Sequence, residues 1–335
     1  MRYRIIGSIA AAMIVTTLSA AAMSCGDDDG DGGDKLTPVT FMLDWVPNTN
    51  HNGVYIAKAK GWYEEAGLDV NIVEPGEGGV EQVVGNQTAQ FGISAQEYVI
   101  PARAAGVPVV SIAAVIQHNT SSLMSLAEDG IEGPGDLAGH TYGGFGGPLE
   151  RALIDALTEC GGGDASQVQY VEVGQAEFLE GMARNQYDFV WIFDGWDGVR
   201  ATELVGADVN FVRFIDNVDC IPDWYTPLII TSEGLIKDDP ETVRAFLAAT
   251  TRGYEYAMEN PDEAATILLD AAPELDAELV RLSAEYLSTR YVEPGRQWGL
   301  QDEAIWTRFE QFLFDAGLID EQIDVDAAYS NAYLP

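Results

Sequence analysis

The sequence is poor in positive charge and in histidine, and each shortage argues against a class of protein. Only 17 lysine and arginine residues stand against 54 acidic ones, which gives a formal net charge of −37. This balance argues against a nucleic-acid partner, because phosphate backbones bind basic surfaces. The three histidines lie far apart in the sequence, and no Cys-x-x-Cys or His-rich spacing predicts a metal site. No Gly-x-Ser-x-Gly motif is present either, which argues against a serine hydrolase.

Cysteine is also scarce, with three residues in the chain. Cys25 lies at the end of an N-terminal apolar stretch, whereas Cys160 and Cys220 lie in the body of the protein. A disulfide between the latter two is chemically possible in an oxidising compartment. They belong to separate predicted elements, however, and the sequence does not give their distance, so we expect each to be a free or buried thiol.

The N-terminus carries the features of a secretory signal. Arg2 and Arg4 precede an uncharged stretch that ends in small residues before Cys25. This arrangement resembles the bacterial lipoprotein signal, in which the cysteine is acylated and becomes the mature N-terminus. We therefore expect a signal at 1–25 with lipid attached to Cys25, and an acidic flexible tether at 26–36. The alternative is an ordinary cleaved signal with a free cysteine.

The remaining chain predicts an α/β fold. Apolar runs alternate with helical patterns, which is typical of mostly parallel sheets covered by helices. The length suits two lobes of roughly 100–150 residues each. We expect one lobe from 37–118 with 226–335 and a second from 119–225, so that the chain crosses between them twice at a hinge.

Individual elements follow from the same patterns. Strands are expected at Thr40–Leu43, Leu68–Val73, Gln90–Ser94, Val109–Ile116, Val168–Val173, Phe189–Phe193, Val209–Phe214 and Tyr225–Thr231. Helices are expected at Asn52–Trp62, Val80–Gly85, Gln96–Ala105, Pro148–Glu159, Pro240–Glu259, Pro261–Asp270, Ala277–Tyr286 and Glu303–Phe314. Gly61, Gly67 and Gly106 mark helix ends.

A polar and aromatic cluster follows the first predicted strand. Trp45, Asn48, Asn50 and His51 lie between the strand and a helix, where open α/β sheets bind ligands. A flat ring is expected to stack on Trp45 while the amides and the imidazole supply hydrogen bonds. For a single asparagine, helix capping is the simpler interpretation, and Trp45 alone would read as a core residue. The cluster as a whole favours a binding site.

A glycine-rich segment, 139–147, precedes another predicted helix. The backbone N–H groups at Gly143 and Gly144 are expected to hold a carbonyl, hydroxyl or anionic substituent of a ligand. Tyr142 and Phe145 would add aromatic faces. The alternative is that these glycines only form turns.

Further candidates lie at other strand ends. Asp194 ends a buried strand and can accept hydrogen bonds from a ring N–H, with Trp196 beside it. Gln96 opens a helix after another strand, and Tyr225 lies at the predicted second crossing. Trp191, in the interior of its strand, is expected in the core.

Four segments, at 45–51, 60–70, 91–94 and 141–146, carry a resemblance that covers nearly the whole mature chain. They resemble the SsuA/ThiY-like family of ABC-transporter substrate-binding lipoproteins, which is related to the thiamine-pyrimidine synthases. The resemblance implies a type II periplasmic-binding-protein fold, with a small flat heteroaromatic ligand held in a cleft between two lobes. It also implies a membrane permease as partner, no cofactor, a monomer anchored outside the cytoplasm, and a thiamine pyrimidine precursor as cargo. Flavin carriers are similar, so riboflavin is the alternative ligand.

The related synthases raise the question of catalysis. They have a lysine and a histidine in the segment that here places Ser94 and Tyr98, and a cysteine cluster where this chain has Cys220 alone. They also carry an acid at the position of Asp194. The missing groups predict a carrier and not an enzyme.

Overall fold

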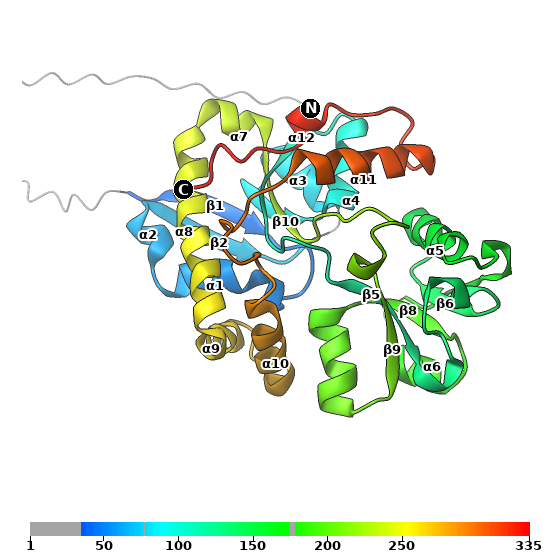
Figure 1. Cartoon of the computed structure of the whole chain (residues 1–335). Helices are drawn as coiled ribbons and strands as arrows, with labels where there is room; N and C mark the ends of the chain where they lie inside the picture. The colour runs from blue at the N-terminus through cyan, green and yellow to red at the C-terminus, as the bar shows by residue number, and fades with distance from the viewer. Residues whose placement is uncertain (1–34, 77, 175–177) are drawn as a thin grey trace, which may run out of the picture. The chain divides into compact units, whose positions relative to one another are not determined.

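The computed structural model describes residues 35–76, 78–174 and 178–335, and Lys35–Pro335 form one compact unit (Figure 1). The predicted signal, Cys25 and most of the predicted tether therefore lie outside the described residues. Within the described part, none of the helices combines the length and the apolar character needed to cross a membrane.

The first of two sheets has the strand order β2-β1-β3-β10-β4. Its strands are β1 (Thr37–Met42), β2 (Leu68–Val73), β3 (Phe91–Ser94), β4 (Val109–Ala114) and β10 (Leu228–Ser232). β1 pairs in parallel with both β2 and β3, whereas β10 is antiparallel to β3 and β4.

The helices that precede the second sheet in the chain are α1 (Asn52–Ala59), α2 (Trp62–Glu65), α3 (Val80–Gly85) and α4 (Gln96–Ala104). Those that follow β10 are α7 (Glu233–Asp238), α8 (Pro240–Glu259), α9 (Pro261–Ala271), α10 (Ala277–Ser288), α11 (Glu303–Asp315) and α12 (Val325–Ala328).

The second sheet has the order β7-β6-β8-β5-β9. Its strands are β5 (Ser121–Leu126), β6 (Thr141–Gly144), β7 (Gln169–Glu172), β8 (Phe189–Phe193) and β9 (Val209–Arg213). β6 runs parallel to β7 and β8, and β5 is antiparallel to β8 and β9. Its main helices are α5 (Pro148–Cys160) and α6 (Phe178–Ala183), and the short helix η5 (Asp194–Gly198) follows β8. The α/β fold is thus confirmed. Both sheets are mixed, and in each of them four strands run in one direction while one strand, β10 or β5, runs in the opposite direction.

Two strands of the second sheet differ from the sequence-based expectation. The segment Thr141–Gly144 was expected to be part of a loop, yet it forms β6 between β7 and β8. A Cβ at Gly143 would lie 2.6 Å from the ring of Tyr187, so this glycine makes room for packing. β5 was not predicted, because its sequence, SSLMSL, is half serine and lacks the β-branched residues typical of strands.

Helix α8 shows how the sequence sets local structure and packing. Asp239 caps it by accepting the N–H of Thr242 at 3.1 Å, and Pro240 occupies its first position, where no N–H is needed. Its Phe246 is fully buried and stacks on Phe91, with ring centroids 3.9 Å apart. Burial of such a side chain stabilises the fold by about 1.5–3 kcal/mol.

Glycine allows α1 to cross α8 closely. A Cβ at Gly53 would lie 2.2 Å from the ring of Tyr254, and one at Gly253 would lie 1.9 Å from the carbonyl oxygen of Gly53. Both positions therefore exclude any side chain. Because α1 continues directly from the loop after β1, this contact fixes where that loop ends.

The two segments that connect the sheets are bonded to each other. His118, on the first crossing, lies with Nδ1 2.6 Å from Asp223 on the second and with Nε2 3.0 Å from Glu293. The hydrogen bond to Asp223 is the main cause that raises the pKa of His118 to about 9, and Glu293 adds to it. Asp223 also accepts the N–H of Asn119 at 3.0 Å. These contacts suit the hinge role that the sequence suggests for this region.

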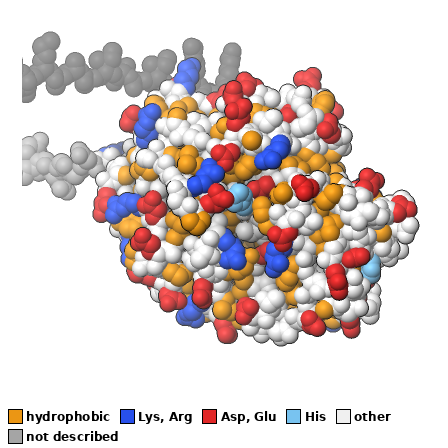
Figure 2. Space-filling view, viewed as in Figure 1, with side chains coloured by type: hydrophobic (Ala, Val, Ile, Leu, Met, Phe, Trp, Pro, Cys, Tyr) orange, Lys and Arg blue, Asp and Glu red, His pale blue; other side chains and the backbone are white. Residues whose placement is uncertain are grey.

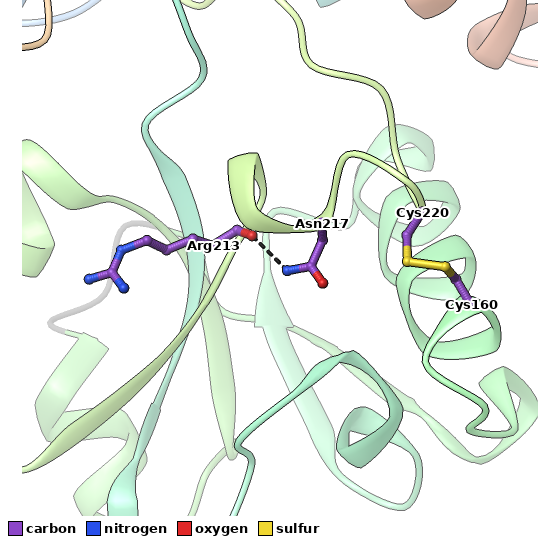
Figure 3. Close-up of a disulfide and its surroundings, with 4 residues drawn as sticks. All are labelled: Cys160, Arg213, Asn217 and Cys220. Carbon is purple, nitrogen blue, oxygen red and sulfur yellow. Dashed lines mark hydrogen bonds between the residues drawn. A yellow bond between two sulfur atoms is a disulfide. The ribbon is translucent and has the colours of Figure 1, made fainter.

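A disulfide joins Cys160 to Cys220, with Cα atoms 5.5 Å apart (Figure 3). The expectation of two free thiols is therefore wrong. Cys160 ends α5, and Cys220 follows a turn in which Asn217 donates to the carbonyl of Arg213 at 2.7 Å. This turn brings the chain back to α5 over a separation of 60 residues, which no local sequence pattern reveals.

Candidate functional site

The loop after β1 is held by its own polar residues. Asn48 accepts the N–H of Asn50 at 3.0 Å and donates to the carbonyl of Val46 at 3.0 Å. Its backbone N–H donates to Nδ1 of His51 at 3.2 Å, so Nε2 of that ring carries the proton and donates to Asp44 at 2.8 Å. His51 is fully buried with both nitrogens bonded. Asn48 and His51 thus shape the loop, and His51 has no nitrogen left for a ligand.

Other elements anchor the same loop. The hydroxyl of Thr49 is 2.5 Å from that of Ser283 on α10, and its carbonyl accepts the hydroxyl of Tyr291 at 2.6 Å. The carbonyl of Asn50 accepts the hydroxyl of Tyr254 at 2.7 Å. Trp45 extends from this fixed base with 48% of its surface exposed. Its position suits stacking, because the loop is rigid while the indole is open.

Four exposed aromatic residues follow the carboxyl ends of neighbouring parallel strands. We call them the aromatic quartet: Trp45 after β1, Tyr98 after β3, Phe145 after β6 and Phe193 at the end of β8. Carboxyl ends of parallel strands meet at one edge of a sheet, so each sheet presents two of these rings. Trp45 and Phe145 were expected at the site from the sequence, whereas Tyr98 and Phe193 were not, although both lie at or just after strand ends.

Acidic groups surround Tyr98. Its pKa is raised to about 12, first by desolvation and then by the charges of Glu97, Glu81, Asp44 and Glu150. Glu150 lies on α5 in the second lobe. In the first lobe, Glu81 lies on α3, Glu97 on α4 and Asp44 in the loop after β1. Charges from both lobes therefore act on one exposed ring, which makes this region rich in hydrogen-bond acceptors.

The glycine-rich segment differs from the expected ligand cradle. Tyr142 is 2% exposed and packs with Phe189 and Tyr170, at centroid distances of 5.4 and 5.9 Å. It therefore offers no free aromatic face. Gly143 and Gly144 are buried in β6, where a Cβ at Gly144 would lie 2.3 Å from the Tyr142 ring. At both positions the absence of a side chain leaves room for a tyrosine ring.

The expected contacts Gln96 and Tyr225 are buried and bonded to each other. The N–H of Tyr225 donates to Oε1 of Gln96 at 3.0 Å, and the N–H of Gln96 donates to the Tyr225 carbonyl at 2.9 Å. The Tyr225 hydroxyl accepts the N–H of Asp302 at 2.8 Å. Both residues are 0% exposed. They join β3 to the second crossing, and among the described residues Nε2 of Gln96 has no hydrogen-bond partner.

Beside them, Glu97 is a buried carboxyl group. It accepts the indole N–H of Trp224 at 2.9 Å, and Trp224 stacks on Phe309 with centroids 4.9 Å apart. Burial raises the pKa of Glu97 to about 8, although its hydrogen bonds with Trp224 and Thr226 lower it. Glu97 is therefore mostly protonated at neutral pH. Trp191 lies edge-on to Trp224 in the core, as expected.

Asp194 and Trp196, expected to act as a pair, have different surroundings. Asp194 is 6% exposed, accepts the hydroxyl of Ser122 at 2.5 Å and lies 3.3 Å from Nε of Arg213. Burial raises its pKa, while Ser122 and Arg213 oppose the rise. Trp196 packs instead against α9 and α10 of the first lobe. It therefore serves contact between the lobes.

A cavity of about 470 Å³ lies beside Asp194. Its walls come from both lobes, with Arg213 and Phe211 on β9 and Leu282 and Tyr286 on α10. Asp194 thus faces an open space, unlike Gln96 and Tyr225. Among the described residues no group of histidines, cysteines and acids is arranged to hold a metal ion.

The strand orders and the two mixed sheets define a periplasmic-binding-protein fold. The solved aliphatic sulphonate binding protein SsuA of Escherichia coli superposes with a TM-score of 0.67 at 14% identity, over 87% of this chain and 91% of its own. This likeness establishes the fold of the chain.

Sequence relatives define the family. Residues 48–264 match the family described as NMT1/THI5 like, and the chain belongs to it. The chain is 30% identical to a formylaminopyrimidine-binding protein of Halalkalibacterium halodurans, over 92% of this chain and 94% of the relative. It is 28% identical to a 4-amino-5-hydroxymethyl-2-methylpyrimidine phosphate synthase of Legionella pneumophila, over 89% and 92%. It is also 29% identical to the riboflavin-binding protein RibY of Chloroflexus aurantiacus, over 90% and 87%.

Proposed function

We propose that this protein is the extracytoplasmic solute-binding component of an ABC importer and that it binds a thiamine pyrimidine precursor of the formylamino or hydroxymethyl type. The single observation that carries the proposal is the aromatic quartet with acids from both lobes around Tyr98. Flat rings stack on exposed aromatic side chains. The acids accept hydrogen bonds from the amino group that such a pyrimidine carries.

Riboflavin is the second candidate, supported by the similarity to RibY. Its ring system presents mainly carbonyl and ring-nitrogen acceptors, which match acidic side chains less well than an amino group does. The acceptor-rich surroundings therefore favour the pyrimidine.

The test is calorimetric titration of the purified protein with hydroxymethyl-aminopyrimidine, formylaminopyrimidine and riboflavin. We expect a pyrimidine to bind tightest, and the Asp194→Asn variant to change the ranking among ligands, because the amide both donates and accepts. A charged hydrogen bond is worth about 1.5–3 kcal/mol, or roughly ten- to a hundredfold in Kd. Binding of riboflavin alone would favour the second candidate, and binding of none would refute the carrier proposal.

A synthase activity is the alternative from another class, because synthases occur in the same family. Ser94 and Tyr98 stand where the synthases have lysine and histidine, and Ser94 donates its hydroxyl to Glu81. We therefore propose that the protein catalyses nothing. Incubation with iron, oxygen and pyridoxal phosphate should give no pyrimidine, and one turnover detected by mass spectrometry would contradict this.

Attachment through Cys25 is part of the proposal and rests on the sequence. The expected result is that Cys25→Ser moves the protein from the membrane to the soluble fraction without changing its thermal stability. Retention of the variant in the detergent phase would contradict a lipid anchor. We propose a monomer, with the membrane permease as its partner.

A further inference from the structure

A carboxylate of the chain itself fills the backbone site at the start of α5. One oxygen of Glu150 accepts the N–H of Phe145 at 3.1 Å and the hydroxyl of Tyr142 at 2.8 Å, and the other accepts the N–H of Gly147 at 2.8 Å. Pro148 follows at the first helical position and has no N–H. Glycine-rich loops before a helix ordinarily offer such N–H groups to phosphate or sulfate. Here Glu150 already uses them.

A second carboxylate lies against the same loop. A Cβ at Gly146 would lie 2.7 Å from Oε1 of Glu172, so the Glu172 side chain covers this part of the backbone. Asp44 and Glu81 of the first lobe act on Tyr98 together with Glu150, whereas Glu97 is mostly protonated at neutral pH and adds little charge. An anionic substituent brought to this place would meet like charges on both sides, which disfavours its binding.

Two arginines of the second lobe are engaged elsewhere. Arg151 lies over the ring of Tyr170, with 3.8 Å between its guanidinium carbon and the ring centroid. Arg213 pairs with Asp194. On the face shown in Figure 2, acidic side chains are spread widely over the surface. Neither arginine is therefore free to neutralise a phosphate at the loop.

We infer that Glu150 is a specificity-determining residue that makes this protein reject phosphorylated and sulfonated ligands and accept only uncharged or cationic ones. The inference rests on the proposed function, and it narrows the ligand to the unphosphorylated vitamin precursor. It also separates this chain from proteins of the same fold that bind sulphonates, such as SsuA.

The experiment compares each vitamin with its phosphate ester by calorimetry. Hydroxymethyl-aminopyrimidine is measured against its phosphate, and riboflavin against flavin mononucleotide. In the wild type we expect the ester to bind at least roughly a hundredfold more weakly. In Glu150→Gln the ratio of the two dissociation constants, ester to vitamin, should shrink by roughly tenfold or more. The like charge is removed, and the amide has one acceptor oxygen in place of two, so one backbone N–H is released. Glu150→Asp keeps the charge and should keep most of the discrimination.

Glu159→Gln is the matched control, because it removes the same charge from the exposed far end of α5. In this variant the ratio of the dissociation constants of ester and vitamin should equal that of the wild type. Equal binding of vitamin and ester by the wild type would overturn the inference, as would an unchanged ratio in Glu150→Gln. If Glu150→Gln does not fold, Glu150→Ala takes its place in the same comparison, and an unchanged ratio in that variant would overturn the inference.

A second arm does not need the vitamin. Thermal unfolding is followed in sodium sulfate and in sodium chloride at equal ionic strength, for the wild type, Glu150→Gln and Glu159→Gln. We expect an extra stabilisation by sulfate in Glu150→Gln only. If no vitamin binds, the proposed function fails while this arm still tests Glu150. An equal response of all three proteins to sulfate would then refute the role of Glu150.

Discussion

The imidazole of His118 lies 2.6 Å from the carboxylate of Asp223, so one ion pair joins the two segments that connect the sheets. Since the raised pKa of His118 is about 9, the folded protein holds this proton where the unfolded chain, with a pKa of 6.5, has released it. The stabilisation is therefore complete below pH 6.5 and is lost as the pH rises through about 9.

The corresponding prediction concerns His118→Gln. Between pH 6.5 and 9 the melting temperature of the wild type should fall, and that of the variant should fall less. We expect the effect to stay below about 1 kcal/mol, because 38% of the side chain is exposed to solvent. His140→Gln, which changes a histidine on the second lobe, is the control. Identical pH profiles of wild type and His118→Gln would contradict the ion pair.

Glu97→Gln should change how the free energy of unfolding depends on pH, over a lower pH range than the one affected by His118. The pKa of Glu97 rises from 4.5 to about 8 on folding, so the folded state retains a proton and stability declines as the pH rises from 4.5 to 8. One proton gives a slope of at most about 1.4 kcal/mol per pH unit. The glutamine accepts the same indole N–H without a charge, so the variant should lack this slope. Urea unfolding at several pH values measures it, with Glu310→Gln, another buried glutamate, as control.

Loss of the disulfide should destabilise the second lobe. Replacing Cys160 and Cys220 together with serine is expected to cost about 2–4 kcal/mol, because the bond closes a loop of 60 residues. Urea unfolding of the wild type with a thiol reductant should reproduce the variant. If the reductant and the double substitution both left the midpoint unchanged, the pairing would be absent in solution.

Trp45→Ala should lower affinity for every flat ligand while leaving the fold intact. An aromatic stacking contact is worth about 0.5–1.5 kcal/mol beyond the area it buries. Asn48→Ala should differ, because it removes the cap of η1 (Thr49–His51) and costs about 0.5–2 kcal/mol of stability. Calorimetry and thermal unfolding separate the two effects. Phe314→Ala, on α11, provides an exposed aromatic control away from the strand ends; an equal loss of affinity there would argue against the quartet.

Sequence reasoning succeeded where local pattern decides structure. β2, β8, α3 and α8 have the predicted bounds, because apolar period and flanking caps or glycines define them. It failed for β6, whose glycines are explained only by Tyr142 and Tyr187 packing on them. Contacts between residues that are far apart in the chain cannot be predicted from a short stretch of sequence.

The residues expected at the candidate site also fall into two groups, those whose position the sequence pattern predicted and those chosen for their chemistry. Trp45 and Asp194 were placed at strand ends by pattern, and Phe145 was placed in the glycine-rich segment. Each of the three has exposed surface or an adjacent cavity. His51, Gln96, Tyr142 and Tyr225 were named for their chemistry, yet each is bonded within the protein. The partners of Gln96 and Tyr225 come from distant segments, whereas those of His51 and Tyr142 lie within eight residues. The sequence tells which groups are polar but not which are already bonded.

The Cys160–Cys220 bond limits which parts of the chain can rotate independently. It joins the C-terminal end of α5 covalently to the start of the segment that leads from the second sheet back to β10. We therefore expect α5, with the Glu150 loop at its other end, and the chain next to Cys220 to move together. Any opening motion has to be absorbed by the bonds between Cys220 and β10 and by the short first connection between β4 and β5. The disulfide thus confines any rotation between the lobes to the few residues around His118 and Asp223.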